Sequence, residues 1–134
     1  MVKIEHLGIA VKDLSISNDL FSRLLNTSPY KQETVEREKV TTSFFQVGES
    51  KIELLQSTDE TGTIHHYIEK KGEGIHHIAF LVEDIEAEVN RMIGEGFQPI
   101  SEHPKPGADN KLVFFFHPKS TGGVLIELCQ EIKK

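Results

Sequence analysis

Two histidines and two glutamates recur at matched places in the two halves of this 134-residue sequence. His6 and His77 each begin the same pattern: two residues, a large apolar residue, one residue, Val, one residue, Asp, then Leu or Ile. The two copies are offset by 71 residues, from 6 to 77. Glu53 and Glu127 stand in the similar runs Ile-Glu-Leu-Leu and Ile-Glu-Leu-Cys, offset by 74 residues, from 53 to 127. The repeat indicates a duplicated half-domain that supplies one histidine and one glutamate twice.

Divalent-metal binding is the chemistry that these residue types favour. Neighbouring side chains on a strand point to opposite faces, so His6 and His77 lie opposite the large apolar residues that follow them. Glu53 and Glu127 are flanked in the same way by Ile and Leu. Two neutral imidazoles and two carboxylates suit a borderline divalent ion. We therefore predict one divalent metal ion (Co2+, Zn2+, Mn2+ or Ni2+) bound by all four residues.

A simpler interpretation exists for each residue taken alone, because a strand histidine is more often a core or surface group than a ligand. The joint recurrence of His and Glu at matched positions favours the metal site instead. His76 is the main competitor, but it points to the face opposite His77, and the alignment with His6 selects His77. The remaining histidines are predicted to be surface residues (His65 and His66) or have no repeat partner (His103 and His117).

The elements that position these residues follow the same duplication. After each first strand, apolar residues at helical spacing predict a helix, with Asp13 (or Ser15) and Asp84 as N-caps. The predicted apolar faces comprise Leu14, Leu20, Phe21, Leu24 and Leu25 in the first helix and Ile85, Val89, Met92 and Ile93 in the second. Strand-like runs follow at residues 40–47, 51–55, 111–116 and 123–129, and a short connecting helix is predicted at 61–71.

These elements define the predicted fold class as α+β, with two tandem βαβββ modules forming a curved mixed sheet around a metal-binding cleft. We expect one domain over residues 1–134, with module one at about 1–72 and module two at about 73–134. No linker or low-complexity segment divides the sequence.

Composition excludes several function classes. The formal net charge of −6 argues against nucleic-acid and anionic-membrane partners, which require a basic face. No apolar run approaches the ~20 residues that span a bilayer. Cys129 is the single cysteine, so no internal disulfide forms, and the N-terminus carries no secretory leader pattern. We expect a cytoplasmic protein whose edge strands allow a homodimer.

The opening His-x-x-Ile-x-Val, repeated as His-x-x-Phe-x-Val, and the late glutamate resemble the vicinal oxygen chelate (glyoxalase/bleomycin resistance/dioxygenase) superfamily. Within it, the sequence is most similar to the methylmalonyl-CoA epimerase family. The similar stretches start at His6, Lys51, Gly74, Ser101 and Phe116, and the last reads Phe-His-Pro-Lys-Ser-Thr-Gly-Gly-Val-Leu-Ile-Glu-Leu. The resemblance covers nearly the whole chain.

The resemblance implies that His6, His77 and Glu127 are metal ligands and that Glu53 is the fourth. It implies a metal-dependent epimerase that interconverts (R)- and (S)-methylmalonyl-CoA through an enolate stabilised by the metal. Glu127 and Glu53 are then the candidate acid/base residues. Some relatives carry a further glutamate on the strand before the Glu53 hairpin, whereas residues 40–47 contain no carboxylate. Glu36 and Glu38 precede that strand, so the second base stays open.

An acyl-CoA thioester substrate would need cationic groups for its phosphates. Lys105, Lys111 and Lys119 flank the second half of the sequence, and each alone is more often a solvated loop lysine. Lys119 lies in the segment most specific to the family, so it is the predicted CoA-binding residue.

Three alternative functions share parts of this pattern. A glyoxalase I-like lactoylglutathione lyase would act on a glutathione hemithioacetal, and the His-Pro-Lys segment argues against it. An extradiol dioxygenase needs two His and one Glu on Fe(II), and the short chain with a fourth ligand argues against it. A non-catalytic small-molecule binding module has no need of four metal ligands.

Overall fold

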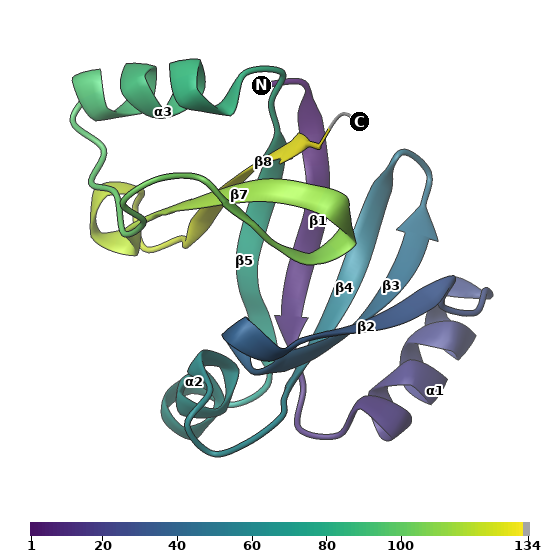
Figure 1. The fold of residues 1–134 in the computed structure, drawn as a ribbon. Coiled ribbons are helices and arrows are strands. Elements are labelled where there is room, and N and C mark those ends of the chain that lie inside the picture. The colour runs from purple at the N-terminus through teal and green to yellow at the C-terminus, as the bar shows by residue number, and fades with distance from the viewer. Residues whose placement is uncertain (133–134) are drawn as a thin grey trace. The chain divides into compact units, whose positions relative to one another are not determined.

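The computed structural model describes residues 1–132, which form eight strands, three α-helices and three short 3-10 helices (Figure 1). In chain order the elements are β1 (Lys3–Ala10), α1 (Leu14–Leu25), β2 (Lys31–Val35), η1 (Glu36–Glu38), β3 (Val40–Val47), β4 (Ser50–Ser57), α2 (Thr63–Lys71), β5 (Gly74–Leu81), α3 (Ile85–Gly94), β6 (Lys105–Pro106), η2 (Ala108–Asn110), β7 (Lys111–Phe116), η3 (Pro118–Ser120) and β8 (Ile126–Glu131). The order confirms the predicted α+β class and the βαβββ succession in each half. None of the helices within residues 1–132 is long and apolar enough to cross a membrane.

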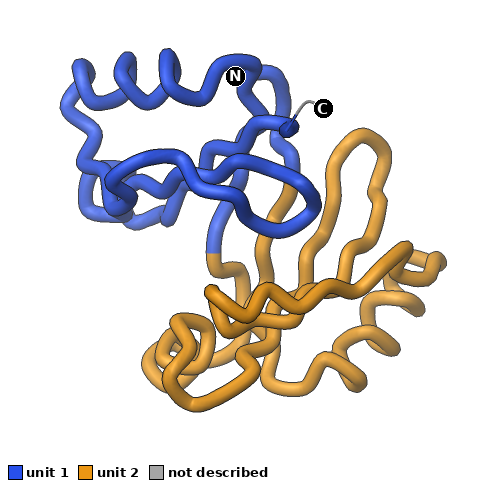
Figure 2. The backbone as a smooth tube through the Cα atoms, in the orientation of Figure 1, with its two compact units in different colours: residues 1–5, 77–134 blue, residues 6–76 orange. Residues whose placement is uncertain are grey.

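The chain forms two compact units (Figure 2). Unit 1 comprises residues 1–5 and 77–134, and unit 2 comprises residues 6–76. Strands β1 and β5 each run across the division, so the units are described separately below. The predicted boundary between the two modules, near residue 72, stays a prediction.

Unit 2 has a mixed sheet with the strand order β2-β3-β4-β1. The β3–β4 hairpin is antiparallel and closes on Val47 and Ser50. Gly48 lies in this tight turn with φ +60°, a conformation that glycine adopts without strain. Strand β1 pairs with β4 in parallel, and α1, β2 and β3 form the connection between them.

Helices cover both faces of unit 2. On one face, Leu14 of α1 packs with Val11, Phe45 and Leu54, and Asp13 caps the helix by accepting a hydrogen bond from the N–H of Ile16. On the other face, Ile64 of α2 packs with apolar residues that include Ala10, Val40 and Leu55. The sequence prediction was wrong for Leu20 and Leu24, which are 49% and 68% exposed on the outer side of α1.

Unit 1 repeats the strand arrangement of unit 2 with the order β5-β8-β7-β6, and among its described residues α3 is the one α-helix. Helix α3 buries Ile85, Val89 and Met92 against the sheet, with Phe114, Phe116 and Leu128 among the contacts. Asp84 caps α3 by accepting from the N–H of Ala87, as predicted. Strand β8 begins at Ile126 rather than at Gly123, because Gly122 and Gly123 have φ +69° and +93°, outside the strand region.

Candidate metal centre

In unit 2, His6 and Glu53 form a buried pair. Strands β1 and β4 are in parallel register, with Gly8 opposite Glu53, two residues beyond His6. The Nδ1 atom of His6 lies 3.0 Å from Oε2 of Glu53, and each side chain is only 7% exposed. Gly8 carries no side chain, so none projects from β1 at the position opposite Glu53.

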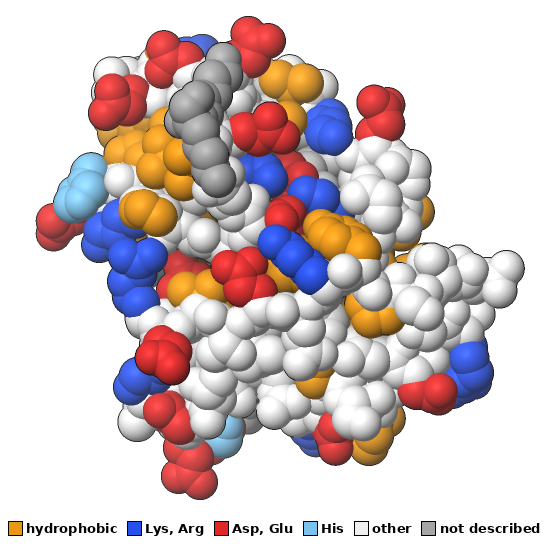
Figure 3. Space-filling model, turned by 45° about the vertical axis from the view of Figure 1, so that its right-hand side comes forward, with side chains coloured by type: hydrophobic (Ala, Val, Ile, Leu, Met, Phe, Trp, Pro, Cys, Tyr) orange, Lys and Arg blue, Asp and Glu red, His pale blue; other side chains and the backbone are white. Residues whose placement is uncertain are grey.

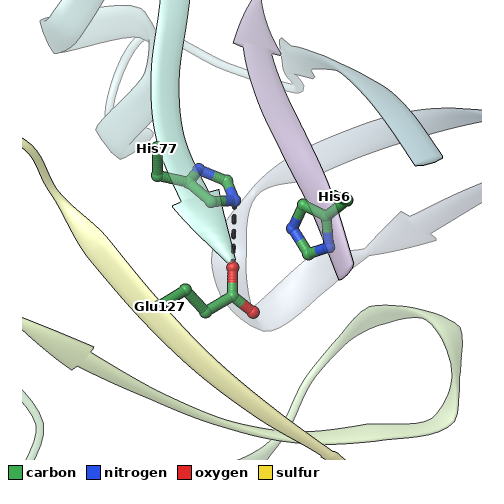
Figure 4. A group of neighbouring side chains, drawn as sticks. All are labelled: His6, His77 and Glu127. Carbon is green, nitrogen blue, oxygen red and sulfur yellow. Dashed lines mark ion pairs between the residues drawn. The ribbon is translucent and has the colours of Figure 1, made fainter. Parts of the chain in front are cut away.

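In unit 1, His77 and Glu127 form the corresponding pair (Figure 4). The Nε2 atom of His77 lies 2.9 Å from Oε1 of Glu127, and both side chains are 7% exposed. Ala79, the small residue two positions after His77, is opposite Glu127 in the β5–β8 register. The ring of Phe115 meets the His77 ring edge-on at 5.9 Å, which fixes the orientation of the imidazole.

The pairs are equivalent in register as well as in sequence. Glu53 is opposite Phe44 on β3, and Glu127 is opposite Phe115 on β7. Each glutamate therefore lies between a small residue on one side and a phenylalanine on the other. The recurrence of this register supports a shared purpose for the two pairs, although His6 contacts its glutamate through Nδ1 and His77 through Nε2.

The donor set and its spacing fit a divalent ion. Two ligand atoms bound at right angles about 2.1 Å from one ion lie about 3.0 Å apart, which matches the separation in each pair. Imidazole nitrogen with carboxylate oxygen suits Zn2+, Co2+, Ni2+ or Mn2+ rather than a soft thiophilic ion. Burial also suits a ligand set, since two carboxylates away from water need cationic compensation.

Two buried polar residues near the pairs escaped the sequence analysis. Glu5 directly precedes His6 and is 3% exposed, and it is a further potential metal ligand. Thr42 is 1% exposed on β3, where it is opposite Leu55 on the face that carries Glu53. Within the described residues, the Thr42 hydroxyl has no hydrogen-bond partner. The alternation of residues along a strand predicts neither the burial of Glu5 nor the missing hydrogen bond of Thr42, because both depend on tertiary packing.

The other histidines have local contacts outside the two pairs. His76 is half-buried and its ring meets Tyr67 edge-on at 4.8 Å. His65 and His66 lie on α2, each 3.6 Å from a carboxylate oxygen of Glu69. His103 is exposed in the loop before β6, and Nδ1 of His117 accepts a hydrogen bond that caps η3.

The candidate CoA lysines differ in environment. Lys119 is exposed in η3, and its backbone N–H donates to His117. Lys105 is exposed in β6, whereas Lys111 is 8% exposed and its Nζ lies 3.7 Å from Oδ2 of Asp109. On the face drawn in Figure 3, basic side chains are interspersed with acidic ones, as expected for the net charge of −6.

Comparison with known families identifies the class of protein to which this fold and these paired residues belong. The chain belongs to the glyoxalase/bleomycin resistance protein/dioxygenase superfamily, whose family model matches residues 5–115. This membership confirms the superfamily predicted from the repeated histidine pattern.

Within this superfamily, several individual proteins are similar to the chain over most of its length. The chain is 36% identical over 127 residues to a mitochondrial methylmalonyl-CoA epimerase of Dictyostelium discoideum, covering 94% of this chain and 76% of that protein. It is 37% identical over 130 residues to the uncharacterized Bacillus subtilis protein YqjC, covering 97% and 93% of the two chains. A variant of Streptomyces coelicolor methylmalonyl-CoA epimerase, in complex with 2-nitronate-propionyl-CoA, matches with a TM-score of 0.93 at 28% identity, covering 98% and 95%. The relatives therefore support an epimerase-like enzyme.

Proposed function

We propose that the chain is a metal-dependent epimerase that interconverts (R)- and (S)-methylmalonyl-CoA. The observation that carries the proposal is the pair of buried histidine–glutamate contacts, at 3.0 Å and 2.9 Å, built on the same strand register in both units. The substrate rests on relatives named methylmalonyl-CoA epimerase. Homodimer formation is part of the same proposal.

One divalent ion would be held by His6, His77 and Glu127, with Glu53 as the fourth ligand. The first three are drawn in Figure 4, and each is buried and offers one donor atom. When bound, the ion would supply a Lewis acid for the thioester carbonyl oxygen, which makes the proton at C2 easier to remove. All four residues lie on strands, whose backbone pairing holds the donor atoms in place.

Glu53 and Glu127 are the proposed acid and base groups. Epimerisation requires a proton to leave C2 on one face and return on the other, so two groups are needed. In the metal-free protein, His6 and His77 hold these carboxylates through the contacts described above. Thr42 belongs to the strand where some relatives carry a further glutamate, and a threonine hydroxyl is too weak a base to replace one.

Lys119 is the proposed contact for the CoA phosphates. It is exposed on η3, whose backbone is fixed by the hydrogen bond to His117. A lysine in this position acts as a point charge, which contributes to binding rather than to chemistry. We therefore expect Lys119→Ala to raise KM severalfold and to leave kcat nearly unchanged.

Solvent deuterium exchange tests the function. Chelator-treated protein, reloaded separately with Co2+, Mn2+, Ni2+ or Zn2+, is mixed with (R)-methylmalonyl-CoA in D2O, and deuterium at C2 is followed by mass spectrometry. We expect exchange with at least one ion and none with chelator. The methylglyoxal–glutathione hemithioacetal serves as the competing substrate, and turnover of that compound alone would overturn the proposal.

The neighbouring histidines give a matched control. His77→Ala should abolish exchange, whereas His76→Ala, one residue away on the same strand, should retain it. The opposite result would mean that the ligand register is wrong by one residue. Glu127→Gln should lower kcat by about 100-fold or more, the range for loss of a general acid or base.

A further inference from the structure

The Thr42 hydroxyl is a buried hydrogen-bond donor that has no acceptor. Thr42 is 1% exposed, and its Oγ1 atom has no hydrogen-bond partner among residues 1–132. Over the same residues, Oδ1 of Asn18 is the other buried side-chain atom that lacks a partner, but the amide nitrogen of Asn18 donates to Gln32. An unpaired buried hydroxyl lowers stability, and native proteins retain such groups where catalysis or ion binding uses them.

Thr42 lies on the sheet face of the His6–Glu53 pair. On β3 it is opposite Leu55, and Phe44, two residues along the same strand, is opposite Glu53. Residues that pair across neighbouring strands share a face, so Thr42 is the diagonal neighbour of Glu53. Diagonal neighbours are about 7–8 Å apart, which is within reach of a long side chain. A change in the Glu53 side-chain conformation can therefore bring a carboxylate oxygen to the Thr42 hydroxyl.

His6 holds the Glu53 carboxylate from the other side when no ion is bound. Strand β4 lies between β1 and β3, and Oε2 of Glu53 is 3.0 Å from Nδ1 of His6 on β1. If Nδ1 and Oε2 both bind one ion, their lone pairs point at it, and the hydrogen bond between them is lost. Glu53 then needs a new donor, because carboxylates that bind a metal are themselves hydrogen-bonded.

We propose that Thr42 is a positioning residue for Glu53, and that its hydroxyl donates a hydrogen bond to the Glu53 carboxylate when Glu53 binds the ion. This inference rests on the metal site of the proposed function but not on its substrate. The burial of Thr42 suits the role, because a neighbouring side chain can reach a hydroxyl that solvent does not. The hydroxyl then lowers stability without metal and contributes to affinity with it.

Glu33 is a second carboxylate beside Thr42. It is directly opposite Thr42 on β2, and its Oε1 lies 3.5 Å from Nζ of Lys31. The Glu33 side chain is 36% exposed, so water and Lys31 solvate its charge. The Glu53 side chain is 7% exposed and depends on donors from the protein. We therefore expect the Thr42 hydroxyl to serve Glu53 rather than Glu33.

Isothermal titration of chelator-treated protein with Zn2+ or Co2+ measures this role. Thr42→Val removes the hydroxyl and should lower the metal affinity at least tenfold, the range for loss of a hydrogen bond to a ligand. In urea unfolding with chelator, the same variant should have a higher midpoint than the wild type, because the unpaired hydroxyl is gone. A purely structural role would move stability and affinity in the same direction. Thr42→Ser keeps the hydroxyl and should retain the wild-type affinity.

Thr41→Val is the matched control. Oγ1 of Thr41 lies 2.9 Å from Oγ1 of Thr34, on the sheet face opposite Thr42. Thr41→Val should therefore lower the urea midpoint and leave the metal affinity unchanged. Added to Glu33→Ala, Thr42→Val should keep its full effect on metal affinity.

The outcomes separate this inference from the proposed function. Wild-type affinity in Thr42→Val would overturn the role of Thr42 and leave the metal site standing. A wild-type chain that binds no divalent ion would overturn the metal site and this role together. Loss of the Thr42→Val effect in the Glu33→Ala background would identify Glu33 as the acceptor and refute the assignment to Glu53. Circular dichroism confirms that each variant is folded.

Discussion

Breaking one histidine–glutamate pair should destabilise the metal-free protein more than removing the whole pair. His77 and Glu127 are in contact at 2.9 Å and both are 7% exposed. Hydrogen bonds to charged groups contribute about 1.5–3 kcal/mol, and removing one partner of a buried carboxylate adds a desolvation cost. We therefore expect His77→Leu to lower the free energy of unfolding by about 2–4 kcal/mol. His77→Leu/Glu127→Leu should lie within about 1 kcal/mol of the wild type, since replacing both members of a buried pair is often neutral.

Urea unfolding with chelator present, analysed as a double-mutant cycle, measures this coupling directly. The same cycle on His6 and Glu53 should give a coupling of the same sign and similar size, because that pair has the same burial and a 3.0 Å contact. A coupling below about 0.5 kcal/mol in both cycles would show that the pairs are open to water, and would refute the burial argument.

Three further predictions concern residues outside the pairs. Thr42→Val should raise the free energy of unfolding by about 1 kcal/mol in urea unfolding, because it removes a buried hydroxyl without a hydrogen-bond partner. A lower free energy of unfolding would show that the hydroxyl makes a hydrogen bond in solution. Asp84→Ala should lower the free energy of unfolding by about 1 kcal/mol by removing the N-cap of α3, measured by urea unfolding, and an unchanged value would exclude the cap. Hydrogen bonds from the hydroxyl and the N–H of Thr61 lower the pKa of Asp59. Asp59 therefore contributes stability at a pH above its ordinary pKa, and this contribution is lost as the pH falls through the pKa of the folded state. Thr61→Ala should raise the pKa of Asp59 in an NMR titration, and an unchanged pKa would mean that the hydroxyl contact is absent.

The repeat was sufficient to predict the βαβββ succession of each half and to single out the four residues that form the two pairs. When one face of a strand is buried, the alternation of side chains determines which residues lie on its other face. The alternation around His6, His77, Glu53 and Glu127 therefore predicted that all four lie on the sheet face opposite the large apolar residues. The structure adds the register, in which Glu53 is opposite Gly8 and Glu127 is opposite Ala79. The role of the two pairs as metal ligands stays a prediction.

Other features depend on packing that one-dimensional patterns do not encode. Strand β2 reads Lys-Gln-Glu-Thr-Val, and its polar composition gave no strand signal because it pairs along one edge only, with β3. Helical periodicity grouped Leu20 and Leu24 with the core residues of α1, although a helix with apolar residues on both sides does not reveal which side is covered. The burial of Glu5 and the unpaired hydroxyl of Thr42 likewise arise from neighbours distant in the sequence.

Metal stoichiometry tests the central claim most directly. The claim is that the two pairs, one in each unit, serve a single ion. Isothermal titration of chelator-treated protein with Co2+ or Zn2+, with His6→Ala, Glu53→Ala, His77→Ala and Glu127→Ala as variants, separates the alternatives. We predict one ion per chain, with affinity lowered at least tenfold by a substitution in either pair. Two ions per chain, or tight binding that survives the loss of one whole pair, would contradict the claim.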